Sequence, residues 1–173
     1  MLFRSTNTRI IGDAVQGFTN SQIMWNGAAS PFGAKQAAAF TYRNAPLNNA
    51  AYPMGLVLKA SGGTLAVPAT YASVTYNAGV VTVSTVTTSG APVVRGTKTF
   101  TLVNGDRLTA LADGLGNVFL FRTNSSGNTA YIGVVAIPIV GASAWAPANG
   151  GGRVGLQVPV GQRVDDFRAG TIV

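Results

Sequence analysis

The stretch from Gly150 to Gly170 reads GGGRVGLQVPVGQRVDDFRAG and contains the clearest strand pattern in the chain. Within it, Val154, Leu156 and Val158 alternate with polar or small residues. Successive side chains of a β-strand point to opposite faces, so an alternation with a period of two predicts a strand with one buried face. We therefore expect a strand over residues 153–158 that lines an apolar core.

The rest of the chain shows the same signature of short strands between turns. Val118–Phe121 and Ile132–Ile139 are apolar on both faces, as more deeply buried strands are. Clusters of Asn, Asp and Gly, which tolerate positive φ, separate such runs. They read YNAG at 76–79, ADGLGN at 112–117 and NSSGN at 124–128. Closely spaced strands with such turns predict an all-β fold, an antiparallel β-sandwich.

Residues 33–43, GAKQAAAFTYR, carry two conflicting signals. The alanine content favours a helix, whereas Ala38, Phe40 and Tyr42 alternate with the residues between them. We predict a strand here, because tertiary context tends to override intrinsic propensity. The same alternation predicts half-buried strands over 56–60 and 99–103.

The chain has 173 residues, which suits one domain with a sizeable core. Residues 1–30 are polar and weakly periodic, and we expect them to form an N-terminal arm and a first strand. Residues 31–173 are expected to form the single sandwich domain. The sequence has no Cys, no secretory signal pattern and no apolar run of about 20 residues that could span a bilayer. We therefore expect a location in the cytoplasm before assembly, or on a virion surface.

The charge balance is basic but dispersed. Twelve Lys and Arg face five acidic residues, all of them Asp, which gives a net charge of +7. A nucleic-acid groove usually concentrates cations and interleaves them with stacking aromatics, and the cations here are scattered along the chain. This favours solubility or an acidic protein partner over specific nucleic-acid binding.

Five stretches resemble one known family. SPFGAKQAAAFTY, MGLVLKASGG, ASVTYNAGVVTVSTV, GDRLTALADGLGNVFLFR and the Gly150–Gly170 stretch occur in this order. Over about residues 30–170 the chain resembles laminin-G-like, concanavalin A-like lectin/glucanase domains. The resemblance implies a jelly-roll sandwich that ends in a G.VGL strand and a DDF strand. The family often has VYRNG after the long hairpin, and here FLFRTNSSGNT fits it only loosely at Arg122 and Asn124.

The residue types present argue against catalysis. The resemblance implies that related glucanases use paired glutamates, and glycoside hydrolysis needs two carboxyl groups roughly 5 to 10 Å apart. The chain has no Glu, and Asp165 and Asp166 are adjacent on a predicted strand, which would point them to opposite faces. The absence of His and Cys excludes a His-based triad and a Cys nucleophile. We therefore predict that the chain is not an enzyme.

Metal binding is weakly supported, and no cofactor is expected. Zinc sites use Cys or His, and the chain has neither. Calcium takes carboxylate and carbonyl oxygens, so the candidate ligands are Asp106, Asp113 and Asp165. The alternative, which we favour, is that Asp106 and Asp113 form turns by bonding their own backbone.

Glycan binding needs exposed aromatic rings beside polar side chains. The candidates are Trp145, Asn149, Tyr131 and Asn124, with Trp25 and Tyr52 as further aromatic residues. Trp145 is the most suggestive, because it lies in the loop-like sequence GASAWAPANGGG. The alternative is that Trp145 packs over the end of the sandwich and that Trp25 lies in the core.

The two adjacent aspartates, Asp165 and Asp166, can also have a purely structural role. If RVDDFRAG is a regular strand, Phe167 and Ala169 point to the core, and Asp166 and Arg168 pair on the solvent face. Asp165 should then lie at the open end of the strand and accept backbone donors.

Together these patterns favour a structural or binding module. We expect a surface component of a phage-like particle, either a capsid decoration or a tail-associated protein, that forms a homo-oligomer or binds other capsid or tail subunits. The alternative is a carbohydrate-binding, lectin-like or adhesin domain. Neither hypothesis involves membrane insertion.

Overall fold

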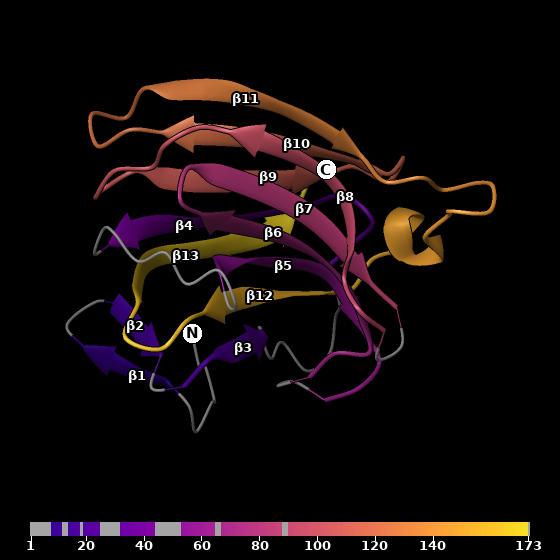
Figure 1. Ribbon diagram of the computed structural model, residues 1–173, viewed down its shortest axis with the longest axis horizontal. Coiled ribbons are helices and arrows are strands. Elements are labelled where there is room, and N and C mark those ends of the chain that lie inside the picture. Colours follow the sequence, from indigo (N-terminus) through magenta and orange to yellow (C-terminus); the bar gives the residue numbers. More distant parts are fainter. Residues whose placement is uncertain are drawn as a thin grey trace.

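Two antiparallel sheets pack face to face around the main core (Figure 1). The computed structural model describes residues 8–11, 14–17, 19–24, 32–43, 53–64, 67–87 and 90–172. Within these ranges, the seven-stranded sheet has the order β1 (Thr8–Ile11), β2 (Ala14–Gly17), β13 (Arg163–Thr171), β4 (Gln36–Arg43), β9 (Arg107–Ala112), β10 (Asn117–Thr123), β11 (Thr129–Ala136). The six-stranded sheet has the order β3 (Ser21–Met24), β12 (Arg153–Val158), β5 (Met54–Ser61), β6 (Thr70–Asn77), β7 (Val80–Val86), β8 (Val93–Thr99). The predicted all-β antiparallel sandwich is confirmed.

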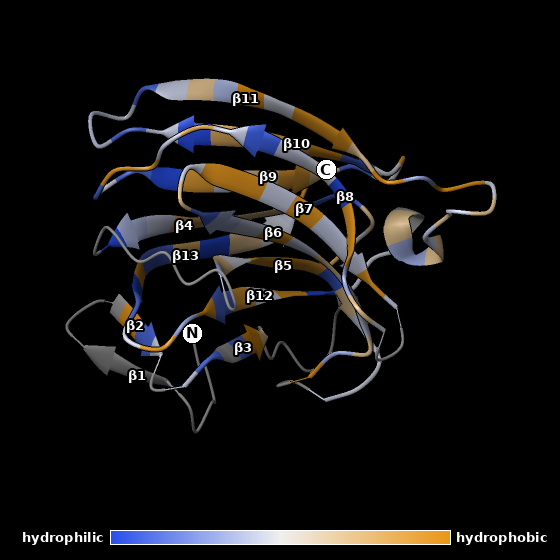
Figure 2. Cartoon of the chain, viewed as in Figure 1, coloured by the Kyte–Doolittle hydropathy of each residue, from blue (hydrophilic) through white to orange (hydrophobic). Residues whose placement is uncertain are grey.

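The core forms where the alternating strands of the two sheets face each other. Val154, Leu156 and Val158 of β12 are all buried in it, as their alternation predicts. Figure 2 shows apolar and polar residues alternating along β7 and β9. A short 3-10 helix, η1 (Ala146–Asn149), follows β11 at one end of the sandwich. No helix in the described part of the chain has the length and apolar composition needed to cross a membrane.

The alanine-rich segment is the strand β4, as predicted. Ala38, Phe40 and Tyr42 point into the core, while Ala39 and Thr41 point to the outer face. Both of these outward residues are nevertheless buried. The strand pairs with β13 on one side and β9 on the other. A central strand forms backbone hydrogen bonds along both edges, and here these interactions outweigh the helix propensity of the alanines.

The predicted turns at 76–79, 112–117 and 124–128 all close antiparallel hairpins. Between β6 and β7, Ala78 and Gly79 both have positive φ, at 47° and 84°, which is the geometry of a tight two-residue hairpin turn. These hairpins fix the register of five strands, β6, β7, β9, β10 and β11, and so they also fix which side chains share a face.

The structure corrects two predictions that were based on alternation. In β5, Lys59 has a φ of 54°, and the register with β6 shifts after Leu58. Ala60 therefore lies with Val57 in a second apolar cluster, away from Leu56 and Leu58 in the main core. The strand predicted over 99–103 is also wrong, because β8 ends at Thr99.

The N-terminal strands lie at the margins of both sheets. β2 pairs with β13, and β3 pairs with β12. The division into an arm over residues 1–30 and a domain over residues 31–173 stays a prediction.

Candidate functional site

The outer face of the seven-stranded sheet carries a row of chemically distinct side chains. Residues paired directly across strands share a face, and the register places Arg168, Ala39, Thr109, Phe121 and Tyr131 in one line across β13, β4, β9, β10 and β11. Neighbouring strands lie about 4.8 Å apart, so the row spans roughly 19 Å. A guanidinium stands at one end, two aromatic rings stand at the other, and small side chains lie between them.

The aromatic end of the row is a contacting pair of rings. The centroids of Phe121 and Tyr131 are 5.5 Å apart, with an interplanar angle of 52°. A register shift between Leu120 and Phe121 places Tyr131 opposite Phe121, and Tyr131 is 58% exposed. Ile132, the residue after it, packs against the core instead. The shift therefore turns a tyrosine outward, where a ligand can reach it.

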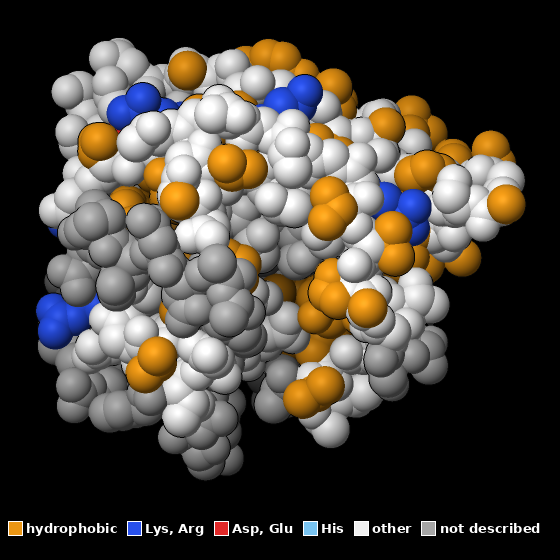
Figure 3. All heavy atoms as spheres, in the orientation of Figure 1, with side chains coloured by type: hydrophobic (Ala, Val, Ile, Leu, Met, Phe, Trp, Pro, Cys, Tyr) orange, Lys and Arg blue, Asp and Glu red, His pale blue; other side chains and the backbone are white. Residues whose placement is uncertain are grey.

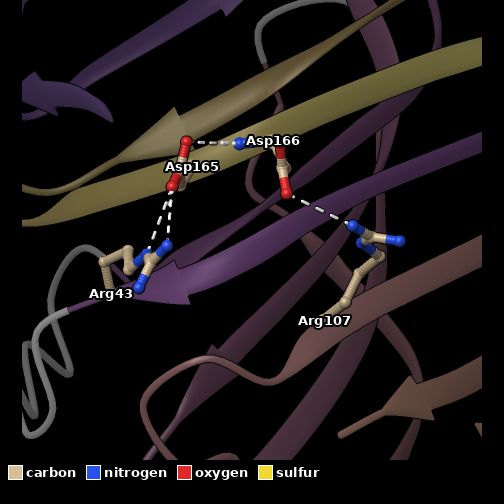
Figure 4. A network of polar contacts seen from close by, with 4 residues as sticks. All are labelled: Arg43, Arg107, Asp165 and Asp166. Carbon is tan, nitrogen blue, oxygen red and sulfur yellow. Dashed lines mark hydrogen bonds and ion pairs between the residues drawn. The ribbon is translucent and has the colours of Figure 1, made fainter. Parts of the chain in front are cut away.

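Two ion pairs lie beside this row (Figure 4). Arg43 donates to Asp165 Oδ2 from Nη2 at 3.0 Å and from Nε at 3.2 Å. Arg107 Nη2 donates to Asp166 Oδ2 at 3.3 Å. Arg107 belongs to β9 and Asp166 to β13, so this second pair reaches across β4, which lies between them. Ala39 and Thr41, the buried outward residues of β4, lie between β13 and β9.

A bulge in β13 creates this arrangement and corrects the predicted one. The register with β4 shifts between Asp165 and Arg168, and Asp166 has a φ of 47°. The Asp166 N–H donates to Asp165 Oδ1 at 2.8 Å, within the strand and not at its open end. The predicted Asp166–Arg168 pair is wrong, because Asp166 pairs with Arg107. Phe167 packs against the core, as predicted.

The outer face carries more positive than negative charge. Four cations and two anions lie on β13, β4 and β9, namely Arg43, Arg107, Arg163, Arg168, Asp165 and Asp166. The buried Nε atoms of Arg107 and Arg163 have no hydrogen-bond partner. Buried polar atoms are normally paired, so these two donors are exceptions among the described residues, and their burial keeps them from direct contact with a ligand.

The predicted glycan residue Trp145 lies in the core. It is 2% exposed, and its indole N–H donates to Val86 O at 3.2 Å. A sugar stacks on an exposed ring face, and Trp145 presents none. Asn124 Oδ1 accepts the backbone N–H groups of Ser126 and Asn128, which is a turn-forming role. The ligand-binding role of these residues stays a prediction.

The remaining predicted residues do not join the row. Asn149 is the last residue of η1. Trp25 and Tyr52 lie outside the described residues. Of the residues named from the sequence, the outer face therefore unites Tyr131 with Asp165 and Asp166, on strands separated by three others.

The candidate calcium ligands are far apart. Asp106 precedes β9 and Asp113 follows it, and a six-residue strand separates them by roughly 20 Å. Asp106 is fully buried, and its Oδ2 accepts Arg122 Nε and the Val103 N–H, each at 2.8 Å. The described residues contain no group of three or more His, Cys, Asp or Glu that could hold a metal ion. One ion cannot be held by both Asp106 and Asp113.

Asp113 forms a turn within the β9–β10 hairpin. Its Oδ1 accepts the backbone N–H groups of Leu115 and Asn117, and its Oδ2 accepts Asn117 Nδ2, all at 2.8 Å. Burial opposes ionisation of this carboxyl, but the hydrogen bonds from Asn117 and Leu115 outweigh it and hold the pKa of Asp113 below its usual range. This geometry is the one that the turn alternative describes.

Lys59 is buried, which no pattern in the sequence predicts. Lys59 Nζ donates to Ala34 O at 2.6 Å and Gly150 O at 2.9 Å. Burial lowers the pKa of Lys59 to about 8, and the nearby Asp113 partly offsets this effect. The Lys59 backbone N–H donates to the fully buried Gln36 Oε1 at 2.8 Å. An isolated lysine in an alternating strand gives no signal of this role.

Comparison with known proteins places this architecture among solved folds. No family model and no curated protein matches the chain. The exoplasmic/lumenal domain of VIP36, in its Ca²⁺/Man3GlcNAc-bound form, has a TM-score of 0.62 and 9% identity, covering 96% of this chain and 82% of that one. The fold is that of the concanavalin A-like lectins and glucanases. The laminin-G-like subdivision within this fold stays a prediction.

Two further structures with less geometric agreement also cover most of the chain. Peanut lectin has a TM-score of 0.46 and 14% identity, covering 94% of this chain and 86% of that one. An alginate lyase from Pseudomonas aeruginosa has a TM-score of 0.45 and 10% identity, covering 98% of this chain and 88% of that one.

The prediction that the chain is not an enzyme is wrong, because neither the fold nor the amino-acid composition excludes catalysis. Several solved structures similar to this chain are alginate lyases, at identities of 10% to 12%. A likeness this distant demonstrates no reaction for this chain. The missing Glu, His and Cys exclude particular mechanisms, but they do not exclude catalysis as such.

Proposed function

We propose that this chain binds an acidic polysaccharide across the outer face of the seven-stranded sheet. The observation that carries the proposal is the row from Arg168 to Tyr131, with arginine at one end and an exposed aromatic pair at the other. Pyranose rings offer flat C–H surfaces that pack on aromatic side chains. Guanidinium groups bind carboxylates through charge-assisted hydrogen bonds. A row about 19 Å long accommodates several sugar units of one strand.

The charge of the face supports an acidic ligand over a neutral one. The arginines on β13, β4 and β9 outnumber the aspartates beside them, and the whole chain carries +7. A neutral polysaccharide would offer these arginines no charged partner.

Isothermal titration calorimetry with polygalacturonate and with dextran tests the proposal. We expect binding of polygalacturonate that weakens with salt, because charge contacts between exposed groups are screened, and little binding of dextran. Tyr131→Ala should weaken binding roughly 2- to 12-fold, the equivalent of an aromatic contact of about 0.5 to 1.5 kcal/mol. Equal binding of both polymers, or none of either, would refute the proposal.

A matched pair of variants separates local contact from overall charge. Arg168→Ala and Arg153→Ala each remove one positive charge, but Arg153 lies on β12 in the other sheet. We expect Arg168→Ala to weaken polygalacturonate binding at least about fivefold, since a charge-assisted hydrogen bond contributes about 1.5 to 3 kcal/mol before solvent screening. The Arg153→Ala protein should bind almost as the wild type does.

A second candidate function is a surface component of a phage-like particle, as a capsid decoration or tail-associated subunit. One observation favours it. Figure 3 shows apolar side chains gathered where the segment after β11 projects from the sandwich. The exposed large apolar residues there and at the start of β8 are Ile139, Val140, Val93 and Val94. Apolar surface of this kind suits contact with other protein subunits.

Light scattering coupled to size exclusion tests this second candidate. A subunit of such a particle should form a stable oligomer, and Val93→Asp with Val140→Asp should dissociate it. A protein that stays monomeric at high concentration, with or without these changes, would count against a homo-oligomeric particle component.

A further inference from the structure

We propose that the Asp166 carboxylate is an internal competitor at the polysaccharide site. It occupies, in the free protein, the place on Arg107 that a carboxylate of the ligand takes when bound. This inference rests on the proposed function, and it adds the residue that limits affinity for acidic ligands. The Asp166–Arg107 pair lies beside the row, because Arg107 precedes Thr109 by two residues on the same outer face of β9.

The contact between Asp166 and Arg107 is weak enough to be exchanged. A single Nη2–Oδ2 distance of 3.3 Å joins them, which is longer than the 2.7 to 2.9 Å typical of charge-assisted hydrogen bonds. The Asp166 side chain is 51% exposed. A ligand carboxylate could therefore replace the Asp166 oxygen at Arg107 Nη2.

The neighbouring pair is built differently and is not expected to exchange. Asp165 Oδ2 accepts two N–H groups of Arg43, at 3.0 and 3.2 Å. Asp165 Oδ1 accepts the Asp166 N–H, and the Asp165 side chain is only 15% exposed. Asp165 thus holds the bulge together, and Asp166 is the carboxylate that the bulge presents to the outer face.

The backbone of Asp166 explains why this residue reaches Arg107. Its φ of 47° lies in the left-handed region, and the bulge removes it from the pairing with β4. Bulges commonly re-aim a side chain next to a functional site. The outward residues of β4 between these two strands are Thr41, which is paired with Arg107 and Asp165, and Ala39, and both have small side chains. Release of Asp166 therefore needs a side-chain rotation and no change in the strand.

Asp166→Asn tests the inference with little risk to the fold. Asn is at least as compatible as Asp with a left-handed backbone and has nearly the same shape. By removing the competing charge, it should raise the affinity for polygalacturonate about two- to fivefold at low salt, the range that an exposed ion pair supports. Asp166→Gly, which also suits positive φ, is the second variant if Asn perturbs folding.

Two controls separate competition from a change in net charge. Thr97→Lys adds the same single positive charge on β8 of the other sheet, at an exposed position, and should raise affinity by less. In an Arg107→Gln background, Asp166→Asn should no longer raise affinity, because the group for which the two carboxylates compete is gone. A gain that survives Arg107→Gln, or that Thr97→Lys reproduces, would overturn the inference.

The outcomes also distinguish this inference from the proposed function. If the wild type binds polygalacturonate and Asp166→Asn binds it equally or less, only the competitor role is overturned. If the wild type does not bind but Asp166→Asn does, the proposed function is overturned for the wild-type protein, whereas Asp166 is still shown to block binding of this polymer. If neither binds, both ideas are overturned.

Discussion

Replacement of Trp145 tests whether this residue stabilises the sandwich or serves a ligand. The side chain is 2% exposed and belongs to the main core cluster. The indole N–H donates to Val86 O at 3.2 Å, and the backbone N–H donates to Pro138 O at 2.8 Å. Trp145→Ala removes the packing around a buried aromatic ring, a change that costs about 3 to 5 kcal/mol of unfolding free energy.

Trp145→Phe divides that cost into packing and hydrogen bonding. The variant keeps an aromatic ring but leaves the carbonyl of Val86 without its donor, and a buried unsatisfied group costs about 1 to 3 kcal/mol. We therefore expect stability to fall from wild type to Trp145→Phe to Trp145→Ala. In a domain of 173 residues, each kcal/mol lowers the thermal midpoint by about 2 to 4 °C. Trp145→Ala should then lower it by roughly 6 to 20 °C.

Equilibrium unfolding in urea, followed by far-UV circular dichroism, measures these differences without relying on tryptophan fluorescence. Val140→Ala is the matched control, because Val140 lies in the same loop and is 79% exposed. Its effect should stay within about 0.5 kcal/mol. A Trp145→Ala protein that unfolds like the wild type but no longer binds polysaccharide would refute the core assignment and support the predicted ligand role.

Two further predictions concern backbone and charge at other positions. The pKa of Lys59, about 8 in the folded protein, lies below its value in the unfolded chain, so the unfolded chain binds the extra proton above pH 8. The free energy of unfolding should therefore rise from about pH 8 to pH 10.5 in the wild type and not in Lys59→Met. Urea midpoints measured across this pH range check the difference. Midpoints that change with pH in the same way for both proteins would contradict the prediction. Gly116→Ala should destabilise the protein more than Gly127→Ala, because both have φ near +90° but only at Gly116 would a Cβ meet a carbonyl, Ile137 O, at 2.4 Å. Equal urea midpoints for the two alanine variants would show that this close approach has no energetic effect.

The sequence predicts those parts of the fold that depend on local pattern. Alternation identifies β12 and β4, and the Asn, Asp and Gly clusters identify the hairpins. These signals are local because a strand's two faces and a turn's positive φ are properties of a few consecutive residues. The antiparallel sandwich follows from them, since short strands in succession bury their apolar faces against each other.

The bulges are what the sequence conceals. Lys59 and Asp166 both adopt positive φ without being Gly, and each shifts the register of its strand. Nothing in MGLVLKAS or RVDDFRAG marks these positions, because the shift is imposed by neighbouring strands and not by the strand itself. Regular alternation therefore assigns Ala60 and Asp166 to the wrong neighbours. For Trp145 the sequence leaves two alternatives open, ligand contact and packing over the end of the sandwich, because its surroundings of Gly, Ala and Pro resemble a loop.

The candidate site depends on these irregularities more than on any motif. Without the β13 bulge, Asp166 would stay in register beside β4, and its carboxylate could not reach Arg107 on β9. Without the shift in the β10–β11 pairing, Tyr131 would not lie opposite Phe121 on the outer face. The irregularities in β13 and in the β10–β11 pairing each turn a polar or aromatic side chain toward the outer face of the seven-stranded sheet. Regular strands build the core here, and interrupted strands present the residues that a ligand would meet.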